Sequence, residues 1–174
     1  MQQITNHYIY KLIVSENYNS VKPIRDRSLL VPEFNEALTR SISKFNAKYP
    51  DIEIVFVETY RSNALQAIHY KNGASKIKKN GMHHYGIAAD LAFQIDGKFS
   101  YNGDYEYLRK CHEEEGLILL GLWDIGHVQF IPVSKQVDLR IEIVKGIKAF
   151  QKENGLVADG IVGPKTIAKA KEVS

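Results

Sequence analysis

The sequence predicts an α+β fold, in which helices and antiparallel strands form one main domain. Residues 32–48 have the apolar spacing of an amphipathic helix, and residues 52–59, 87–95 and 127–133 are rich in β-compatible side chains. No strand–helix–strand unit repeats along the chain, which argues against a parallel sheet. At 174 residues, 44% hydrophobic and 25% charged, the chain has the composition of an ordinary globular domain with a small appendage.

The helices and the first strand follow in order from local signals. Pro32 suits a first helical turn, and the apolar side chains that follow repeat at helical spacing, so this helix should pack behind the sheet: Phe34, Leu38, Ile42 and Phe45. Residues 52–59 form a strong strand pattern, and Ser62 is a good N-cap for a helix that extends to about Lys71. Residues 104–115 read as a further helix that buries Cys111.

The segments 87–95 and 127–133 bring three polar residues together if they pair as antiparallel strands. Asp90 and His127 can then point from the same face of the sheet, because side chains alternate with period two. His83 arrives from the preceding loop, and Gly86 allows a sharp turn between them. An aspartate within an apolar strand is costly unless it meets a cation or a metal.

Two histidines and one aspartate form a ligand set that leaves one position on zinc open for water. We therefore expect a metal site formed by His83, Asp90 and His127. Asp124, three residues before the last ligand, can be aimed at the open position by a turn through Gly126, and would act as the general base.

The remaining histidines and the tryptophan carry weaker signals. We expect surface positions for His7, His69 and His112, and His84 either contacts substrate or is solvated in its loop. Trp123 either walls the cleft or belongs to the core.

Three motifs together resemble a peptidase family. They are His83-x-x-Gly86-x-Ala88-x-Asp90, Asp124-x-x-His127, and Thr59-Tyr60-Arg61-Ser62 followed by Gln66. Over residues 55–130 the chain is similar to the D-alanyl-D-alanine carboxypeptidase and L-alanyl-D-glutamate endopeptidase family, which includes VanY- and VanX-like enzymes and several phage endolysins. The resemblance implies a Hedgehog/DD-peptidase-like fold, a small antiparallel sheet flanked by helices.

The resemblance also implies the roles of the site residues. Zinc would be held by His83, Asp90 and His127, Asp124 would be the base, and Arg61 would face the scissile carbonyl. A fixed guanidinium there stabilises a developing oxyanion.

The identity of the base favours one substrate bond. Endolysin-like endopeptidases of this family often have Asp where carboxypeptidases have Glu, so Asp124 favours the L-alanyl-D-glutamate bond of the peptidoglycan stem peptide. Two alternatives stay open: a D-Ala-D-Ala carboxypeptidase, and a non-catalytic peptidoglycan-binding protein. Gly81 stands where the family usually has Ser, which is a hint of the latter because Gly has no hydroxyl to orient the metal ligands.

The chain changes character after Val133. Residues 136–154 read as a helix, and the following segments resemble the second half of peptidoglycan-binding modules: Phe150-Gln151, Gly155-Leu156, Asp159-Gly160 and Gly163-Pro164-Lys-Thr166. We therefore predict a zinc peptidase domain over residues 1–134 and a helical, partly module-like segment over residues 135–174. About 40 residues rarely form a stable core alone, so this segment must borrow packing from the catalytic domain or be a reduced module. Its role is either wall binding or that of a structural cap.

Charge and hydropathy limit which partners and which cellular location we expect for the protein. A net charge of +3 suits an anionic partner but does not identify one; the resemblance selects bacterial peptidoglycan, and we expect no nucleic-acid partner and a monomer. No stretch reaches the roughly 18 to 20 apolar residues of a membrane span. The N-terminus lacks a basic region ahead of its apolar run, so we expect cytoplasmic synthesis without a signal peptide, and action on the wall after release, as for a phage or prophage endolysin.

Overall fold

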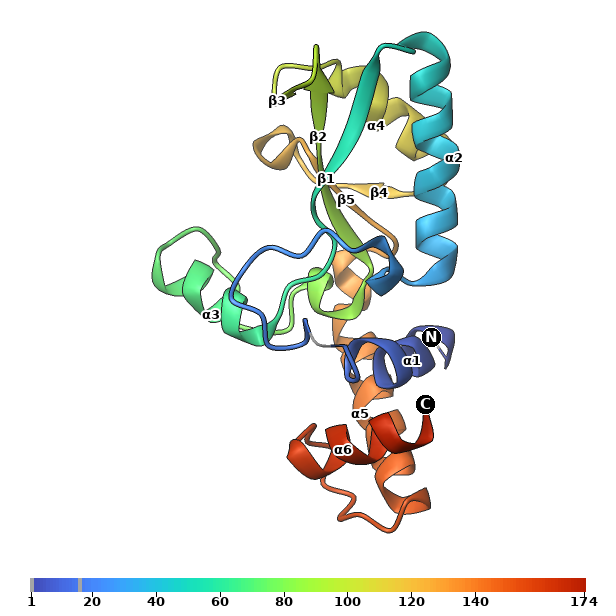
Figure 1. The fold of residues 1–174 in the computed structure, drawn as a ribbon, viewed down its shortest axis with the longest axis vertical. Coiled ribbons are helices and arrows are strands. Elements are labelled where there is room, and N and C mark those ends of the chain that lie inside the picture. Colours follow the sequence, from blue (N-terminus) through green and yellow to red (C-terminus); the bar gives the residue numbers. More distant parts are fainter. Residues whose placement is uncertain (1, 16) are drawn as a thin grey trace. The chain divides into compact units, whose positions relative to one another are not determined.

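The computed structural model describes residues 2–15 and 17–174 (Figure 1). Its contacts divide the chain into two compact units that interleave along the sequence. The first unit contains Met1–Val21, Ser62–Gly81 and Val133–Ser174, and the second contains Lys22–Arg61 and Met82–Pro132. The domain boundary predicted after residue 134 stays a prediction.

The second unit contains an antiparallel sheet and two long helices. Its strands are β1 (Ile52–Glu58), β2 (Ala88–Ile95), β3 (Lys98–Ser100), β4 (Ile118–Leu119) and β5 (His127–Gln129). Within the described residues the sheet has the order β1-β2-β5-β4, and β3 pairs with β2. The helices are α2 (Pro32–Lys48) and α4 (Tyr105–Glu114), and three short 3-10 helices connect the elements: η2 (Arg27–Leu29), η3 (Met82–Tyr85) and η4 (Leu122–Asp124). The predicted α+β class is confirmed.

One face of the sheet is packed against α2 and α4 (Figure 1). Phe93 of β2 lies 5.7 Å from Phe45 of α2 and 4.6 Å from Tyr105 of α4, measured between ring centroids. Because side chains alternate along a strand, Phe93 and Asp90 point to opposite faces. The helices therefore supply the core, and Asp90 is left on the other face.

His112 of α4 is part of this core, and the expected surface position is wrong. Its side chain is buried, and its Nδ1 lies 2.8 Å from the hydroxyl of Ser41 on α2. Burial lowers the pKa of His112 to about 4, so the ring is neutral near pH 7. His112 thus acts as a small hydrogen-bonded link between the two helices.

The strand at residues 127–133 is shorter than its pattern predicts. Pairing ends at Gln129, after which Phe130 donates one more backbone bond to Ile87. The side chain of Gln129 then donates to the carbonyl of Ile131 at 2.7 Å, and Pro132 has no N–H to continue a ladder. A side-chain bond and a proline together end β5.

Gly86 makes the turn between His83 and β2, as predicted. Its φ of +65° is left-handed, and a Cβ at this position would lie 2.2 Å from the carbonyl oxygen of Leu29 in η2. The carbonyl of Gly86 accepts from the amide of Val31 at 2.8 Å. The turn is therefore pressed against a neighbouring backbone, and only glycine fits there.

The first unit is helical in its described residues. It contains α1 (Gln2–His7), the π-helix η1 (Tyr8–Leu12), α3 (Asn63–Lys71), η5 (Val133–Lys135), α5 (Gln136–Glu153) and α6 (Pro164–Val173). The predicted N-cap of α3 is confirmed, because the hydroxyl of Ser62 accepts from the amide of Leu65 at 3.0 Å. None of the described helices is both long and apolar enough to cross a membrane.

Helix α5 packs against the N-terminal helices of its unit. A Cβ on Gly146 would lie 2.2 Å from the methyl group of Thr5, and the rings of Tyr10 and Phe150 meet edge to face at 5.9 Å. His7 is also buried, against the expected surface position. The C-terminal segment thus obtains part of its core from the start of the chain.

Candidate metal centre

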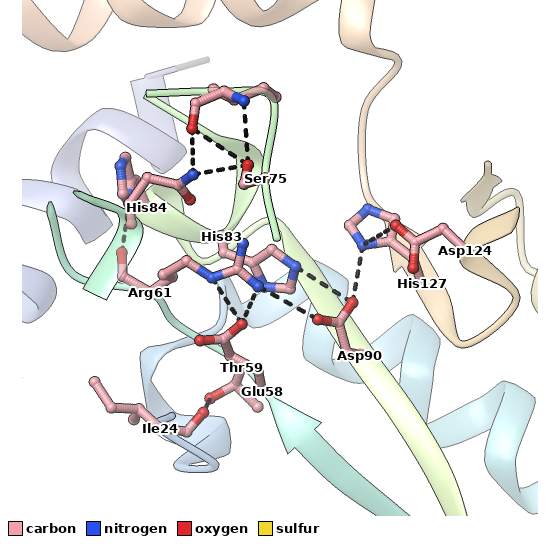
Figure 2. A network of polar contacts seen from close by, with 12 residues as sticks. Ile24, Glu58, Thr59, Arg61, Ser75, His83, His84, Asp90, Asp124 and His127 are labelled. Carbon is pink, nitrogen blue, oxygen red and sulfur yellow. Dashed lines mark hydrogen bonds and ion pairs between the residues drawn. The ribbon is translucent and has the colours of Figure 1, made fainter. Parts of the chain in front are cut away.

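Three neighbouring strands place polar residues in one row across the face of the sheet opposite α2 and α4. Asp90 of β2 is paired with Glu58 of β1 on one side and with His127 of β5 on the other. His83 comes from η3, just before β2, and its imidazole lies beside Asp90 (Figure 2). The predicted antiparallel pairing of Asp90 with His127 is present.

The three predicted ligands converge. Oδ1 of Asp90 lies 2.9 Å from Nδ1 of His127 and 3.4 Å from Nε2 of His83. One potential donor atom from each residue falls within 4.8 Å of the other two. Ligand atoms about 2.1 Å from a tetrahedral ion lie roughly 3.4 Å apart, so the spacing and the N, N, O donor set fit Zn²⁺. The three residues could hold a metal ion.

The charges within this cluster favour an ionised aspartate. Burial alone would raise the pKa of Asp90, but the neighbouring imidazoles of His83 and His127 hold it well below its usual range. For His127, burial lowers the pKa, but the hydrogen bond to Asp90 outweighs it and raises the value above normal. An ionised carboxylate between two imidazoles is the state that a divalent cation requires.

Gln129 orients the imidazole of His127. Its Oε1 lies 3.1 Å from Nε2 of His127, and it is itself fully buried and held by the carbonyl of Ile131. Since Oε1 is an acceptor, Nε2 donates its proton to Gln129, and Nδ1 faces Asp90, where it can bind a metal ion once it has lost its own proton. The second nitrogen of His83, Nδ1, is buried and has no hydrogen-bond partner among the described residues.

Asp124 lies at the rim of this cluster. It ends η4, and its Oδ2 is 3.9 Å from Nδ1 of His127. Its side chain is 40% exposed, so water reaches it. The turn beyond Asp124 is close-packed, because a Cβ on Gly126 would lie 2.6 Å from the carbonyl oxygen of Leu91.

Arg61 lies on the other side of Asp90. Its Nη2 is 3.6 Å from Oδ2 of Asp90, and its guanidinium is bound to the carboxylate of Glu58 (Figure 2). The backbone of Arg61 donates to the carbonyl of His83 at 3.3 Å and accepts from Nδ1 of His84. These bonds fix the Arg61 segment to the segment that carries the first ligand.

The structure excludes one of the two expectations for each of His84 and Trp123. His84 is buried, not solvated, and burial lowers its pKa to about 4, so it is a neutral donor to the carbonyl of Arg61. Trp123 is 80% exposed and Leu122 is 76% exposed, so neither belongs to the core.

Two buried residues of the centre were not expected from the sequence. Glu58 binds Arg61, and Gln129 binds His127. Each lies at a short spacing from its partner, three residues before Arg61 and two after His127, and Glu58 ends the mostly apolar strand β1. A carboxylate next to an apolar run was a usable signal for Glu58, as it was for Asp90.

The loop between α5 and α6 is organised by one buried side chain. Nε2 of Gln151 lies 3.0 Å from Oδ1 of Asp159, 3.0 Å from the carbonyl of Ile161 and 3.1 Å from the hydroxyl of Thr166. Its Oε1 accepts from the amide of Gly160 at 2.8 Å. Gln151 therefore holds the whole loop against its two flanking helices.

Comparison with known proteins gives one family match and one similar solved structure. Residues 139–169 match the model of a peptidoglycan binding domain family. Among solved structures, the chain is similar to the L-Ala D-Glu endopeptidase ChiX of Serratia marcescens, with 22% identity, a TM-score of 0.42, and coverage of 65% of this chain and 94% of that chain. No curated protein matches the chain.

Proposed function

We propose that this protein is a zinc peptidase that hydrolyses the stem peptide of peptidoglycan at the L-alanyl-D-glutamate bond. The observation that carries the proposal is the convergence of His83, Asp90 and His127, with a carboxylate at one rim and a guanidinium at the other. The motif resemblance and the peptidoglycan binding match at residues 139–169 support the choice of substrate.

The side chains around the cluster are suited to distinct steps. When bound, a zinc ion supplies a Lewis acid that polarises a carbonyl and acidifies water. Asp124, partly exposed and adjacent to His127, accepts the proton of the attacking water and returns it to the leaving amine. Arg61 offers its guanidinium to the negative charge that develops on the carbonyl oxygen.

The remaining predictions concern the use of the whole chain. We propose that residues 1–134 carry out the hydrolysis and that residues 135–174 hold the enzyme to the wall. The protein would act as a monomer, synthesised in the cytoplasm and released to the wall in the manner of an endolysin. The loop that the buried side chain of Gln151 holds lies within the matched residues and would present that wall-binding surface.

The test is mass spectrometry of fragments released from purified peptidoglycan by the zinc-loaded protein. We expect new L-Ala carboxyl ends and D-Glu amino ends, which disappear after chelation and return when Zn²⁺ is restored. Release of terminal D-Ala alone would make the protein a carboxypeptidase, and no product would favour a binding protein.

Two variants distinguish a loss of metal binding from a loss of catalysis. Asp124→Ala should bind Zn²⁺ with unchanged stoichiometry and lose at least about 100-fold in rate, since general-base catalysis contributes that much. His83→Ala should lose the metal, as measured by elemental analysis after dialysis. Undiminished lysis by Asp124→Ala would contradict the assigned base, and full zinc occupancy in His83→Ala would remove His83 from the site.

A further inference from the structure

We propose that Glu58 is a positioning residue that holds the guanidinium of Arg61 in place beside Asp90. The inference rests on the proposed function, because it assigns Glu58 a part in the same site. It depends on two independent observations: an irregularity in β1, and the contacts of a buried carboxylate.

The irregularity in β1 determines which way Glu58 points. Phe56 pairs with Leu91, but the next paired residue is Glu58, opposite Asp90, so β1 has one extra residue between them. Without this bulge, Val57 would oppose Asp90 and Glu58 would oppose Ala89, on the face that α2 and α4 cover. The bulge therefore turns Glu58 onto the face of the metal ligands, and bulges beside sites often redirect a side chain in this way.

The contacts of Glu58 are concentrated on one oxygen. Its Oε2 accepts from Nε of Arg61 at 2.8 Å and also from Nη2. Its Oε1 is buried and has no hydrogen-bond partner among the described residues, and the residue as a whole is 4% exposed. A buried carboxylate with one unsatisfied oxygen is costly, so its presence here points to a role beyond the packing of β1.

Glu58 restrains where the guanidinium of Arg61 reaches. Nε and Nη2 both donate to Oε2, and Nη2 lies 3.6 Å from Oδ2 of Asp90. A group that stabilises a developing charge must be in place before the reaction, because reorganising it costs rate. Glu58 is thus expected to act on the reaction through Arg61.

The first experiment needs no substrate. We would record the arginine Nε–H signals in ¹⁵N-correlated NMR spectra, identify that of Arg61 by its loss in Arg61→Lys, and measure its exchange with water. Glu58→Gln keeps the shape of the side chain but removes the charge, and charge-assisted bonds are about twice as strong as neutral ones. We expect the Arg61 Nε–H to exchange about tenfold faster in Glu58→Gln, which corresponds to a modest loss of bond strength.

The second experiment is a kinetic double-mutant cycle with Arg61→Ala. In the natural background Glu58→Gln should lower kcat by about 10- to 100-fold with little change in KM, as expected for a misplaced catalytic group. In the Arg61→Ala background it should cause no further loss, because the group through which it acts is gone. Glu53→Gln, an exposed substitution in the same strand, serves as the matched control and should leave both measurements unchanged.

The melting temperatures of all variants show whether a substitution acts only by destabilising the fold. Arg61→Ala leaves Glu58 buried without its cation, so Glu58→Gln should lower the melting temperature of the natural protein but raise that of Arg61→Ala. Equal exchange of the Arg61 Nε–H in Glu58→Gln and the natural protein would overturn the positioning role, as would losses in kcat that multiply in the double variant. If the natural protein proves inactive, the proposed function fails, and the NMR measurement still decides the inference.

Discussion

At the scale of single residues, hydrogen bonds fix the orientation of His127, one of the three candidate metal ligands. His127 has two nitrogens that could face Asp90, and the acceptor oxygen of Gln129 occupies one of them. Gln129 is in turn immobilised by the carbonyl of Ile131 and by complete burial. The ring of His127 is therefore oriented with Nδ1 toward Asp90, the neighbouring candidate ligand.

Gln129→Leu should weaken metal binding while leaving the fold intact. The variant keeps a buried side chain of similar volume but removes the acceptor at Nε2, and loss of such partners typically costs 10- to 100-fold in metal affinity. Competition with a chromogenic chelator measures the change. Gln94→Leu, a half-buried glutamine further along β2, is the matched control. Equal Zn²⁺ affinity in all three proteins would show that Gln129 does not set the state of His127.

At the scale of elements, the position of His83 depends on a turn with no room for a side chain. The 3-10 helix η3 ends at Tyr85, and Gly86 then reverses the chain into β2 against the backbone of Leu29. The carbonyl of Gly86 accepts a hydrogen bond from the amide of Val31, the residue that precedes α2. The same turn thus joins the first ligand, the central strand and the start of the long helix.

Gly86→Ala should be far more damaging than Gly97→Ala. Both glycines have a left-handed φ, of +65° and +72°, which costs an alanine about 1 kcal/mol. At Gly97 a Cβ meets nothing within 4 Å, whereas at Gly86 it would lie 2.2 Å from the carbonyl oxygen of Leu29. Because the backbone of Leu29 or of the turn must move to relieve this clash, we expect Gly86→Ala to lower the free energy of unfolding by about 3 kcal/mol or more.

Urea denaturation of the two glycine variants, followed by circular dichroism, provides the measurement. Equal losses of stability would mean that the backbone of Leu29 moves aside at little energetic cost, and that the turn does not hold η3 against η2. A loss of metal affinity in Gly86→Ala alone would add that the same turn positions His83.

At the scale of the whole molecule, the proposed chemistry and the proposed attachment belong to different units. The proposed metal ligands, Asp124 and Arg61 lie in the unit of residues 22–61 and 82–132, and residues 139–169 lie in the other. The C-terminal segment shares its unit with the start of the chain and with α3. Its short length is therefore offset by contacts with α1 and η1, such as those of Gly146 and Phe150.

Gln151→Leu should reduce wall binding without affecting the metal. The substitution removes the four polar contacts that Gln151 makes to the loop of residues 155–163 and to Thr166, so the loop loses its attachment to α5. In an Asp124→Ala background, which would keep the wall intact, we expect about tenfold weaker co-sedimentation with purified peptidoglycan. Glu153→Gln, exposed on the same helix, is the control. Unchanged sedimentation would assign residues 135–174 a structural role.

The sequence by itself determined the elements and the composition of the centre, because these depend on local pattern. Apolar spacing and caps located α2, α3 and α4, and an aspartate within an apolar strand pointed to a metal at Asp90. Only the tertiary structure decided which residues support the ligands. The bulge that turns Glu58 onto the face of Asp90, the burial of His84 and His112, and the interleaving of the two units arise from contacts between distant segments, and no local pattern encodes such contacts.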